Sequence, residues 1–355
     1  MSKNDDIDIK IILYILLFLL FGIIIITCKT VPSDTVMTVT GPVPVEKTGI
    51  TLEHEHILVD FIGADSTGPW RWDKEKVVEK VLPYLLEVKQ KGVNTLIECT
   101  PAYLGRDPLI LKELSAKSGM NLITNAGFYG ARKNKYIPSF FYSSSPEELA
   151  ELWTNEFRNG IDNTGIKPGF IKISVDADSV LSPEHKKIIT AAGLTHLQTG
   201  LVIASHTGPD DPAFEQIQIL DSLGVDPSAF IWVHAQGGTV EGNLEAAKRG
   251  VWISLDGVTM NPDKPSDEAG NIGWYAERII LLKNEGFLGK ILISHDAGWY
   301  DPEFEDGGSF RGFTDIFDYL IPALKEKGLT QNEIDQILVR NPAEAFTIRI
   351  RKKNN

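Results

Sequence analysis

From about Gly49 onward, short apolar and β-branched runs alternate with longer segments whose apolar residues recur at helical spacing. Several short runs, such as TLIE, LVIA and ILIS, are continuously apolar, as strands buried on both faces require. The pattern predicts eight strands, at residues 50–60, 94–100, 121–126, 169–175, 201–206, 230–234, 251–255 and 290–296.

The segments between these strands have the amphipathic pattern of helices. Residues 74–91 place Val77, Val81, Leu85 and Val88 on one face, and prolines begin several of the other segments. Further helices are predicted at residues 108–118, 146–159, 183–199, 212–223, 243–249 and 332–346. Eight strand–helix units in one chain predict an α/β fold, a (β/α)8 TIM barrel that forms a single catalytic domain over residues 49–348.

The N-terminal segment differs from the rest of the chain. Residues 11–27 are almost entirely apolar and stop at Cys28, a length near the lower limit for a membrane-spanning helix. An apolar segment that ends at a lone cysteine fits a bacterial lipoprotein signal, in which the cysteine is lipidated; an uncleaved signal anchor is the alternative. We therefore expect a lipoprotein-type signal peptide or membrane anchor at residues 1–28, a linker at 29–48, a basic tail at 349–355, and an extracytoplasmic, membrane-attached enzyme.

Composition narrows the choice of partners. The 355 residues are 43% apolar and 23% charged, which is ordinary for a globular protein with a real core. A net charge of −13 argues against nucleic acid as a partner, because phosphate binding needs a concentrated basic surface. Cys99 is the second of only two cysteines and lies in an apolar run, so no disulfide framework is indicated.

Candidate chemistry gathers at the carboxyl ends of the predicted strands, where the reactive groups of such a barrel lie. His54 and His56 are one residue apart on the first strand and therefore project to the same face. His206 and His234 end the fifth and sixth strands, and Asp296 ends the eighth. Four of the seven histidines thus occupy strand positions, which suggests a shared ligand such as a metal ion.

Lys172 lies within the otherwise apolar run GFIKISVD. A buried ammonium group must be paired, neutralised or modified. A salt bridge to a carboxylate is one interpretation, but a carboxylated lysine explains more, because the two oxygens of its carbamate can each bind one metal ion. The histidines, this carbamate and Asp296 then predict a site for two divalent cations about 3.5–4 Å apart that clamp the oxygens of a substrate.

The chain resembles the phosphotriesterase family of the amidohydrolase superfamily. The resemblance covers residues 49–346 and rests on ordered motifs, namely EHEHILVD, IECTPAYLGRDP, NAGFYG, GIKPGFIKIS, ASHTG, WVHAQG, ISHDAGW and ILVRNPAEAF. It implies six metal ligands, His54, His56, Lys172, His206, His234 and Asp296. The first two histidines and the aspartate would hold the more buried metal, the other two histidines the more exposed one, and carboxylated Lys172 would bridge them.

The resemblance also implies a mechanism and a choice of metals. A hydroxide between the two ions would attack a carbonyl or phosphoryl centre, and Asp296 would accept its proton. Zn²⁺ suits imidazole ligands and is the first expectation, while Mn²⁺, Co²⁺ and Fe²⁺ also occupy mixed nitrogen and oxygen sites.

Other residues are expected near the substrate. Tyr129 matches an aromatic position that lines the pocket in related lactonases. Trp299 and Tyr300 follow the eighth strand and would wall the leaving-group side. Trp72 lies in the loop after the first strand, where it either covers the pocket or packs within its own loop. Glu55, between the two first-strand histidines, should face the helices as a structural residue.

The substrate that we expect is a small ester or lactone, with phosphotriesters as further substrates. Lactonases of the family that cleave acyl-homoserine lactones tend to carry an arginine after the seventh strand's aspartate, whereas Gly257 follows Asp256 here, which weakens that assignment. An amidase for an N-acyl compound is one alternative. A non-catalytic ligand-binding barrel is another, although it predicts the loss of a ligand and none is missing. Dimers are frequent among relatives, so a homodimer is one expected oligomeric state.

Overall fold

A computed structural model of the chain, which describes residues 34–353, contains every predicted strand. The strands are β3 (Ile50–Leu58), β4 (Val93–Glu98), β5 (Asn121–Ile123), β6 (Asn125–Ala126), β7 (Phe170–Ser174), β8 (Ile203–His206), β9 (Phe230–Val233), β10 (Trp252–Leu255) and β11 (Ile291–Ile293). Their pairings are all parallel. β5 and β6 flank Thr124 and together correspond to the third predicted strand.

The strands form two sheets that meet at both edges. One has the order β11-β10-β9-β8-β7-β6, and the other has the order β12-β3-β4-β5, where β12 is Gly298–Tyr300. The chain itself connects β5 to β6. At the opposite edge, Asp296 N donates to His54 O (3.1 Å) and His56 N donates to Ala297 O (2.8 Å), which ties the segment after β11 to β3. This α/β arrangement is consistent with a (β/α)8 barrel.

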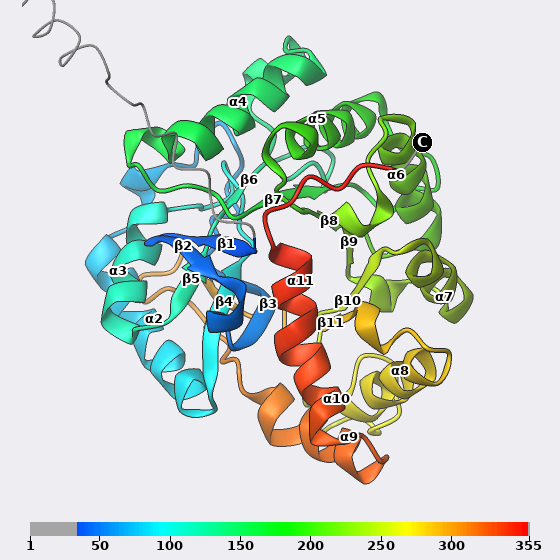
Figure 1. Cartoon of the computed structure of the whole chain (residues 1–355). Coiled ribbons are helices and arrows are strands. Elements are labelled where there is room, and N and C mark those ends of the chain that lie inside the picture. Colours follow the sequence, from blue (N-terminus) through cyan, green and yellow to red (C-terminus); the bar gives the residue numbers. More distant parts are fainter. Residues whose placement is uncertain (1–33, 354–355) are drawn as a thin grey trace, which may run out of the picture. The chain divides into compact units, whose positions relative to one another are not determined.

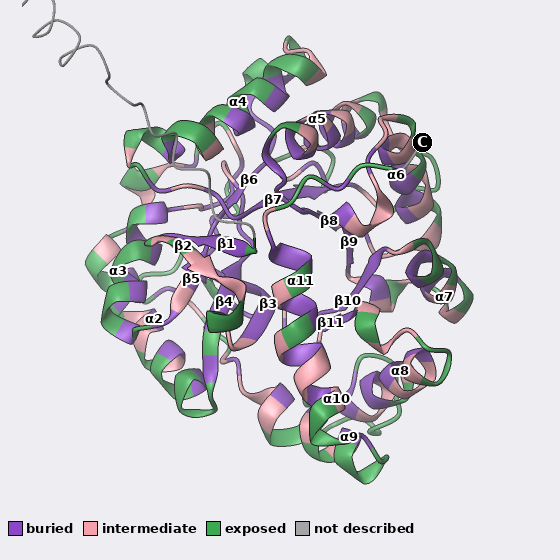
Figure 2. Ribbon diagram, viewed as in Figure 1, coloured by how far each residue is buried: buried purple, intermediate pink, exposed green. Residues whose placement is uncertain are grey.

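Helices surround the ring of strands (Figure 1). They are α2 (Lys74–Gln90), α3 (Pro108–Ser118), α4 (Pro146–Asn159), α5 (Pro183–Thr199), α6 (Asp210–Ser222), α7 (Val240–Arg249), α8 (Ile272–Asn284), α9 (Ile321–Glu326), α10 (Gln331–Asp335) and α11 (Asn341–Phe346). Three of them start with a capping side chain followed by proline: Asp107, Ser145 and Ser182 each accept hydrogen bonds from backbone N–H groups of the first turn. Buried residues lie on the strands and on the inward helix faces (Figure 2).

The segment that we expected to be a linker contains a hairpin instead. β1 (Thr35–Thr38) pairs antiparallel with β2 (Gly41–Pro44). Val36 is 1% exposed and belongs to the same buried apolar cluster as Phe170 and Phe346. β1–β2 and α11 lie across the same end of the ring (Figure 1), and the hairpin therefore covers the amino-terminal end of the strands.

The basic tail is also more ordered than we expected. Arg349 N donates to Gly200 O (3.0 Å), and the guanidinium of Arg351, which is 7% exposed, donates to Glu344 O (2.6 Å). Backbone carbonyls at the end of α11 thus hold a charge that composition alone assigns to solvent.

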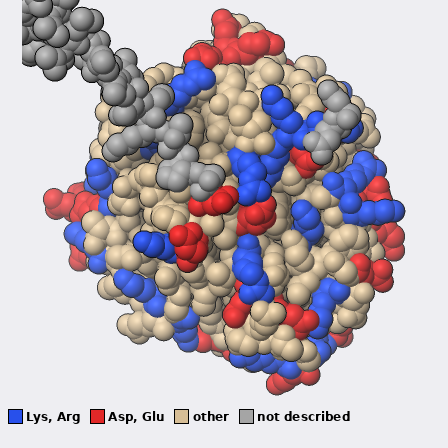
Figure 3. All heavy atoms as spheres, viewed as in Figure 1, with Lys and Arg blue, Asp and Glu red and all other residues tan. Residues whose placement is uncertain are grey.

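The predicted signal or anchor, including Cys28, lies outside the described residues. Within residues 34–353, no helix combines the length and the apolar character needed to cross a membrane. On the face that carries β1–β2 and α11, basic and acidic side chains are interspersed (Figure 3).

Candidate active site

A cavity of about 530 Å³ lies at the carboxyl ends of the strands. It brings together all six predicted ligands, which are His54, His56, Lys172, His206, His234 and Asp296. Tyr129 and Trp299 line it as well. Residues separated by more than 240 positions in the sequence therefore share one pocket, as the barrel rule predicts.

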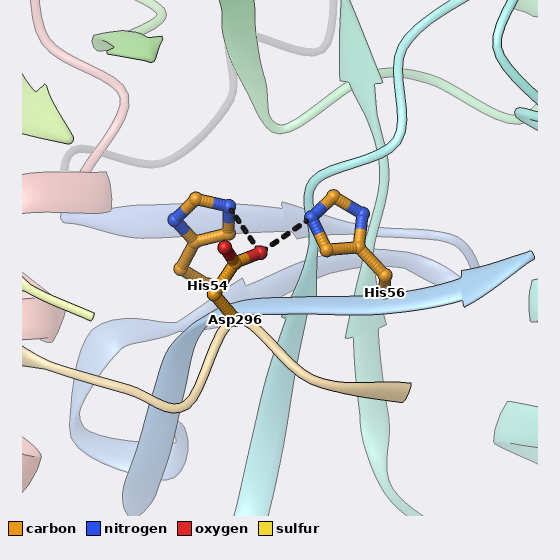
Figure 4. A group of neighbouring side chains, drawn as sticks. All are labelled: His54, His56 and Asp296. Atoms are coloured by element: carbon orange, nitrogen blue, oxygen red, sulfur yellow. Dashed lines mark ion pairs between the residues drawn. The ribbon is translucent and has the colours of Figure 1, made fainter. Parts of the chain in front are cut away.

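His54, His56 and Asp296 form a group whose ligand atoms lie close enough together to hold a metal ion (Figure 4). Asp296 Oδ1 lies 3.1 Å from His56 Nε2 and 3.6 Å from His54 Nε2. Burial would raise the pKa of Asp296, but the neighbouring histidines outweigh it and lower the pKa. Asp296 is therefore a carboxylate at neutral pH, and its side chain is 27% exposed toward the pocket.

Asp256, at the end of β10, orients two of the histidines through their Nδ1 atoms. Its carboxylate accepts from His54 Nδ1 (2.8 Å) and from His234 Nδ1 (2.7 Å). A proton on each Nδ1 leaves the lone pair of each Nε2 directed into the cavity, which is the tautomer that a metal ligand needs. Gln236 Nε2 and Ser254 Oγ also donate to Asp256, so the carboxylate is fixed on several sides.

The imidazoles titrate differently because their surroundings differ. Burial, helped by the charge of Lys172, lowers the pKa of His54 to about 4. Burial and then the charge of His234 lower the pKa of His206. For His234 itself, burial lowers the pKa, but Asp256 outweighs burial and the net change is upward. His54 and His206 are consequently neutral near pH 7.

His206 lies at the end of β8 beside His234, with ring centroids 4.4 Å apart. The Tyr129 hydroxyl lies 3.2 Å from His206 Nδ1 and 3.3 Å from its Nε2. Tyr129 therefore lines the cavity in contact with a candidate ligand. Trp299 also lines the cavity, with its ring centroid 6.1 Å from that of His56.

Lys172 is 1% exposed, and its Nζ lies 3.3 Å from His54 Nε2. No carboxylate oxygen of residues 34–353 lies within 4.0 Å of its Nζ. The described residues therefore provide no salt bridge for Lys172. A buried ammonium without a counter-ion is costly, so the charge state of Lys172 requires an explanation beyond a salt bridge.

Glu55 contacts the segment that carries Asp296. Its carboxylate accepts from Ser294 Oγ (2.7 Å), His295 Nδ1 (2.6 Å) and Ala297 N (3.0 Å). Glu55 thus fixes the backbone on both sides of Asp296, and these partners lie in the segment after β11 rather than on the helices that we expected it to face.

Two of the predicted pocket residues do not line the cavity. Trp72 is buried and its Nε1 donates to Asp107 Oδ2 (3.0 Å), so it packs within its own loop. Tyr300 pairs with Leu58 in β3 and lines a different hollow, together with Pro83 and Tyr84 of α2. Because side chains alternate along β12, Trp299 and Tyr300 take opposite sides.

Sequence reasoning missed three residues at the site. Asp256 follows the seventh predicted strand, so the strand-end rule could have identified it. Glu53 lies beneath the site, where its carboxyl group shares a hydrogen bond with Ser254 Oγ, and burial followed by the charge of Asp256 raises its pKa. Arg132 lines the cavity from a loop after β6, and no motif marks it.

The donor set fits divalent cations. Three Nε2 atoms lie within 3.1–4.0 Å of the Asp296 oxygens, and the three rings belong to His54, His56 and His234. Neutral imidazoles with a carboxylate are typical ligands for Zn²⁺ and similar ions. A second group consists of His54, His234 and Asp256. Both imidazoles donate from Nδ1 to Asp256, so this carboxylate orients the two rings and is not itself proposed as a metal ligand.

The chain thus combines a ring of parallel strands with a histidine-lined cavity at their carboxyl ends. This combination is typical of metal-dependent hydrolases. The model of the phosphotriesterase family matches residues 34–346, and the chain belongs to that family. Its members typically depend on divalent metals, and the chain is a hydrolase of this family.

Three relatives match most of the chain. A phosphotriesterase homology protein of Escherichia coli is 26% identical over 302 residues, 85% of this chain and 99% of the relative. An aryldialkylphosphatase of Saccharolobus solfataricus is 28% identical, covering 84% of this chain and 95% of its own. An N-acetyltaurine hydrolase of Xenopus tropicalis is 28% identical, covering 89% of this chain and 99% of its own.

Proposed function

We propose that the chain is a binuclear metal-dependent hydrolase of small esters or lactones, with phosphotriesters as further substrates. The observation that carries the proposal is the convergence in one 530 Å³ cavity of four histidines, Asp296 and a buried Lys172 that forms no ion pair within residues 34–353. Two divalent cations, when bound, would supply Lewis acidity toward a substrate oxygen and a hydroxide nucleophile.

The roles of the residues follow from their positions. His54 and His56 with Asp296 would hold one cation, His206 and His234 the other, and the carbamate of Lys172 would bridge them. Asp256 keeps two of the imidazoles oriented.

Asp296 has a second role in the proposal. It is ionised and partly exposed to the pocket, so it can accept the proton of the nucleophile and pass it outward. Tyr129 and Trp299 both line the cavity and would orient an apolar acyl or aryl group.

Amide hydrolysis is the second candidate. It is favoured by the similarity to N-acetyltaurine hydrolases over 89% of the chain. A catalytically silent barrel is less well supported, because all six ligand-type side chains are present in the cavity.

A hydrolase panel tests these alternatives. The metal-loaded protein is offered lactones, aryl esters, N-acyl amino acids and a paraoxon-like triester, each with Zn²⁺, Mn²⁺ and Co²⁺. The highest kcat/KM on esters or lactones supports the first proposal, and the highest value on N-acyl amino acids supports the second. No turnover of any compound by fully loaded protein contradicts both.

We also propose that residues 1–28 attach the enzyme to the outer side of a bacterial inner membrane. Lipid attachment at Cys28 predicts labelling by radioactive palmitate that disappears in Cys28→Ala. Membrane attachment that persists without labelling would instead support the uncleaved anchor. Protein recovered wholly in the soluble fraction contradicts attachment.

A further inference from the structure

A strained turn follows β6 at the mouth of the cavity. Arg132, Lys133 and Asn134 have φ values of 61°, 57° and 61°, so three consecutive residues with side chains adopt the left-handed conformation. Each such residue costs about 1–3 kcal/mol, and strain of this kind concentrates at ligand-binding sites. The turn is therefore held by its surroundings against its own preference.

Groups on and after β7 hold this turn. The carboxylate of Asp176 accepts from Arg132 N (2.7 Å) and Lys133 N (3.2 Å). Ser174 Oγ accepts from Ala131 N (2.8 Å). The same strand carries Lys172, so the turn has a fixed position relative to the floor of the site.

The turn presents a free cation to the cavity. The Arg132 side chain lines the cavity, and its guanidinium has no hydrogen-bond or ion-pair partner among residues 34–353. Burial raises the pKa values of Tyr129 and Tyr136, and the charge of Arg132 counteracts both increases. Arg132 is thus electrostatically close to Tyr129, whose hydroxyl contacts the candidate ligand His206.

A second cation lies beside the first. Lys135 also lines the cavity, and its Nζ donates to Phe61 O (2.6 Å) and lies 5.4 Å from the centroid of the Tyr136 ring. Asp296, among the ligands, is the one acidic residue of the cavity lining described for residues 34–353. Arg132 and Lys135 thus give this part of the cavity lining a positive charge although the chain carries a net charge of −13, while the carboxylate of Asp176 lies behind the turn.

We propose that Arg132, assisted by Lys135, forms an anion subsite, and that the substrate carries a carboxylate or sulfonate on the part remote from the bond that is cleaved. This rests on the proposed hydrolase function and names the substrate class. Arg132 is solvent-exposed at the cavity mouth, and its unpaired guanidinium can donate two parallel hydrogen bonds to such a group. An arginine placed only for solubility would need no left-handed turn.

The test compares matched 4-nitrophenyl esters on the full metal-loaded chain. The monoester of glutaric acid and the ester of 4-sulfobutanoic acid carry an anion, whereas the pentanoate ester is neutral and of similar length. The readout is the ratio of kcat/KM for each anionic ester to that for the neutral ester. We expect the wild type to favour at least one anionic ester, by about tenfold at low salt and less at 0.5 M salt.

The variants are Arg132→Gln, Arg132→Lys and, as a matched control, Lys133→Gln. Lys133 shares the left-handed turn but does not line the cavity. The ratio should fall about tenfold in Arg132→Gln, recover in part in Arg132→Lys, and stay unchanged in Lys133→Gln. An unchanged ratio in Arg132→Gln, with circular dichroism equal to that of the wild type, would overturn the subsite.

A second measurement separates this proposal from the hydrolase function. If the wild type hydrolyses none of the esters, the proposed ester hydrolysis is contradicted, and calorimetric titration with glutarate then decides the subsite. Binding that is about tenfold weaker in Arg132→Gln than in Lys133→Gln supports the subsite. Equal binding by the two variants overturns it.

Discussion

Asp256 illustrates how one residue organises the site without reaching the substrate. It accepts hydrogen bonds from His54 Nδ1 and His234 Nδ1, and burial, which raises its pKa, is outweighed by the two histidines, which lower it. The carboxylate thus selects one tautomer in two imidazoles, which belong to the two proposed metal positions.

Asp256→Asn should weaken metal binding. Asparagine offers one acceptor oxygen, so at least one histidine loses its partner or meets an N–H group, and the affinity for Zn²⁺ should fall about 10–100-fold. Competition with a chromogenic chelator measures this. The exposed Asp263→Asn serves as control, and equal affinities in the two variants would contradict the role of Asp256.

Glu98 is a buried carboxyl group near the same site. Its Oε1 accepts from Thr100 N (3.2 Å) and Ile57 N (3.4 Å), while Oε2 has no hydrogen-bond partner. Burial raises its pKa from 4.5 to about 7, although the charge of His56 opposes the increase. The folded protein therefore favours the protonated form.

This shift predicts a pH-dependent cost. Below pH 4.5 Glu98 is protonated in both folded and unfolded chains, and as pH rises to 7 the unfolded chain ionises first, so stability is lost. The loss is about 3 kcal/mol and is complete above pH 7. The difference in unfolding free energy between Glu98→Gln and the wild type should therefore grow by this amount in favour of the variant from pH 4.5 to pH 8. Denaturant unfolding of the metal-free proteins measures it. A constant difference across that range would refute the assignment.

At the scale of elements, β12 depends on a glycine. Gly298 has a φ of 102°, and a Cβ atom there would lie 1.8 Å from His56 O. Gly298 pairs with His56 in the register of β12 and β3, two residues after Asp296. The close approach of this segment to β3 thus brings Asp296 to the histidines.

Gly298→Ala should separate these segments. The clash and the positive φ together predict a loss of at least about 2 kcal/mol in unfolding free energy, together with weaker metal binding. Gly289→Ala is the matched control, because no atom lies within 4 Å of the Cβ position there. Thermal unfolding that shifts equally in both variants would argue against the close approach.

Strands and helices were predictable where periodic runs were long. Helices α3, α4 and α5 have the predicted bounds because proline and glycine mark their ends. β1 and β2 were missed, since four-residue strands carry too little periodicity to be distinguished from a linker. A register shift in β3 between Leu52 and Glu55 was also hidden, because alternation assumes a regular strand.

That shift matters to the floor of the site. Ser254 and Asp256 share one face of the chain at the end of β10, and they contact the adjacent residues Glu53 and His54, respectively. Regular alternation would put these two neighbours on opposite faces. The bulge therefore places an additional carboxyl group beneath the histidines, which strand periodicity could not foresee.

At the scale of the whole molecule, the candidate ligands could be predicted because the barrel rule depends only on strand order. All six meet in one cavity. Pocket walls follow from loop geometry instead: Tyr129 and Trp299 line the cavity, whereas Trp72 and Tyr300 do not, and strand order distinguishes neither pair. Arg132 was missed because its orientation depends on a left-handed turn that no local pattern encodes.

The account as a whole depends on a two-metal centre bridged by carboxylated Lys172. Elemental analysis of protein produced with Zn²⁺ and bicarbonate measures this directly, with Lys172→Ala analysed in parallel. We predict two ions per chain in the wild type and a loss of at least one in Lys172→Ala, while circular dichroism shows the fold retained. A wild-type content near zero, or two ions kept in Lys172→Ala, would contradict the central claim.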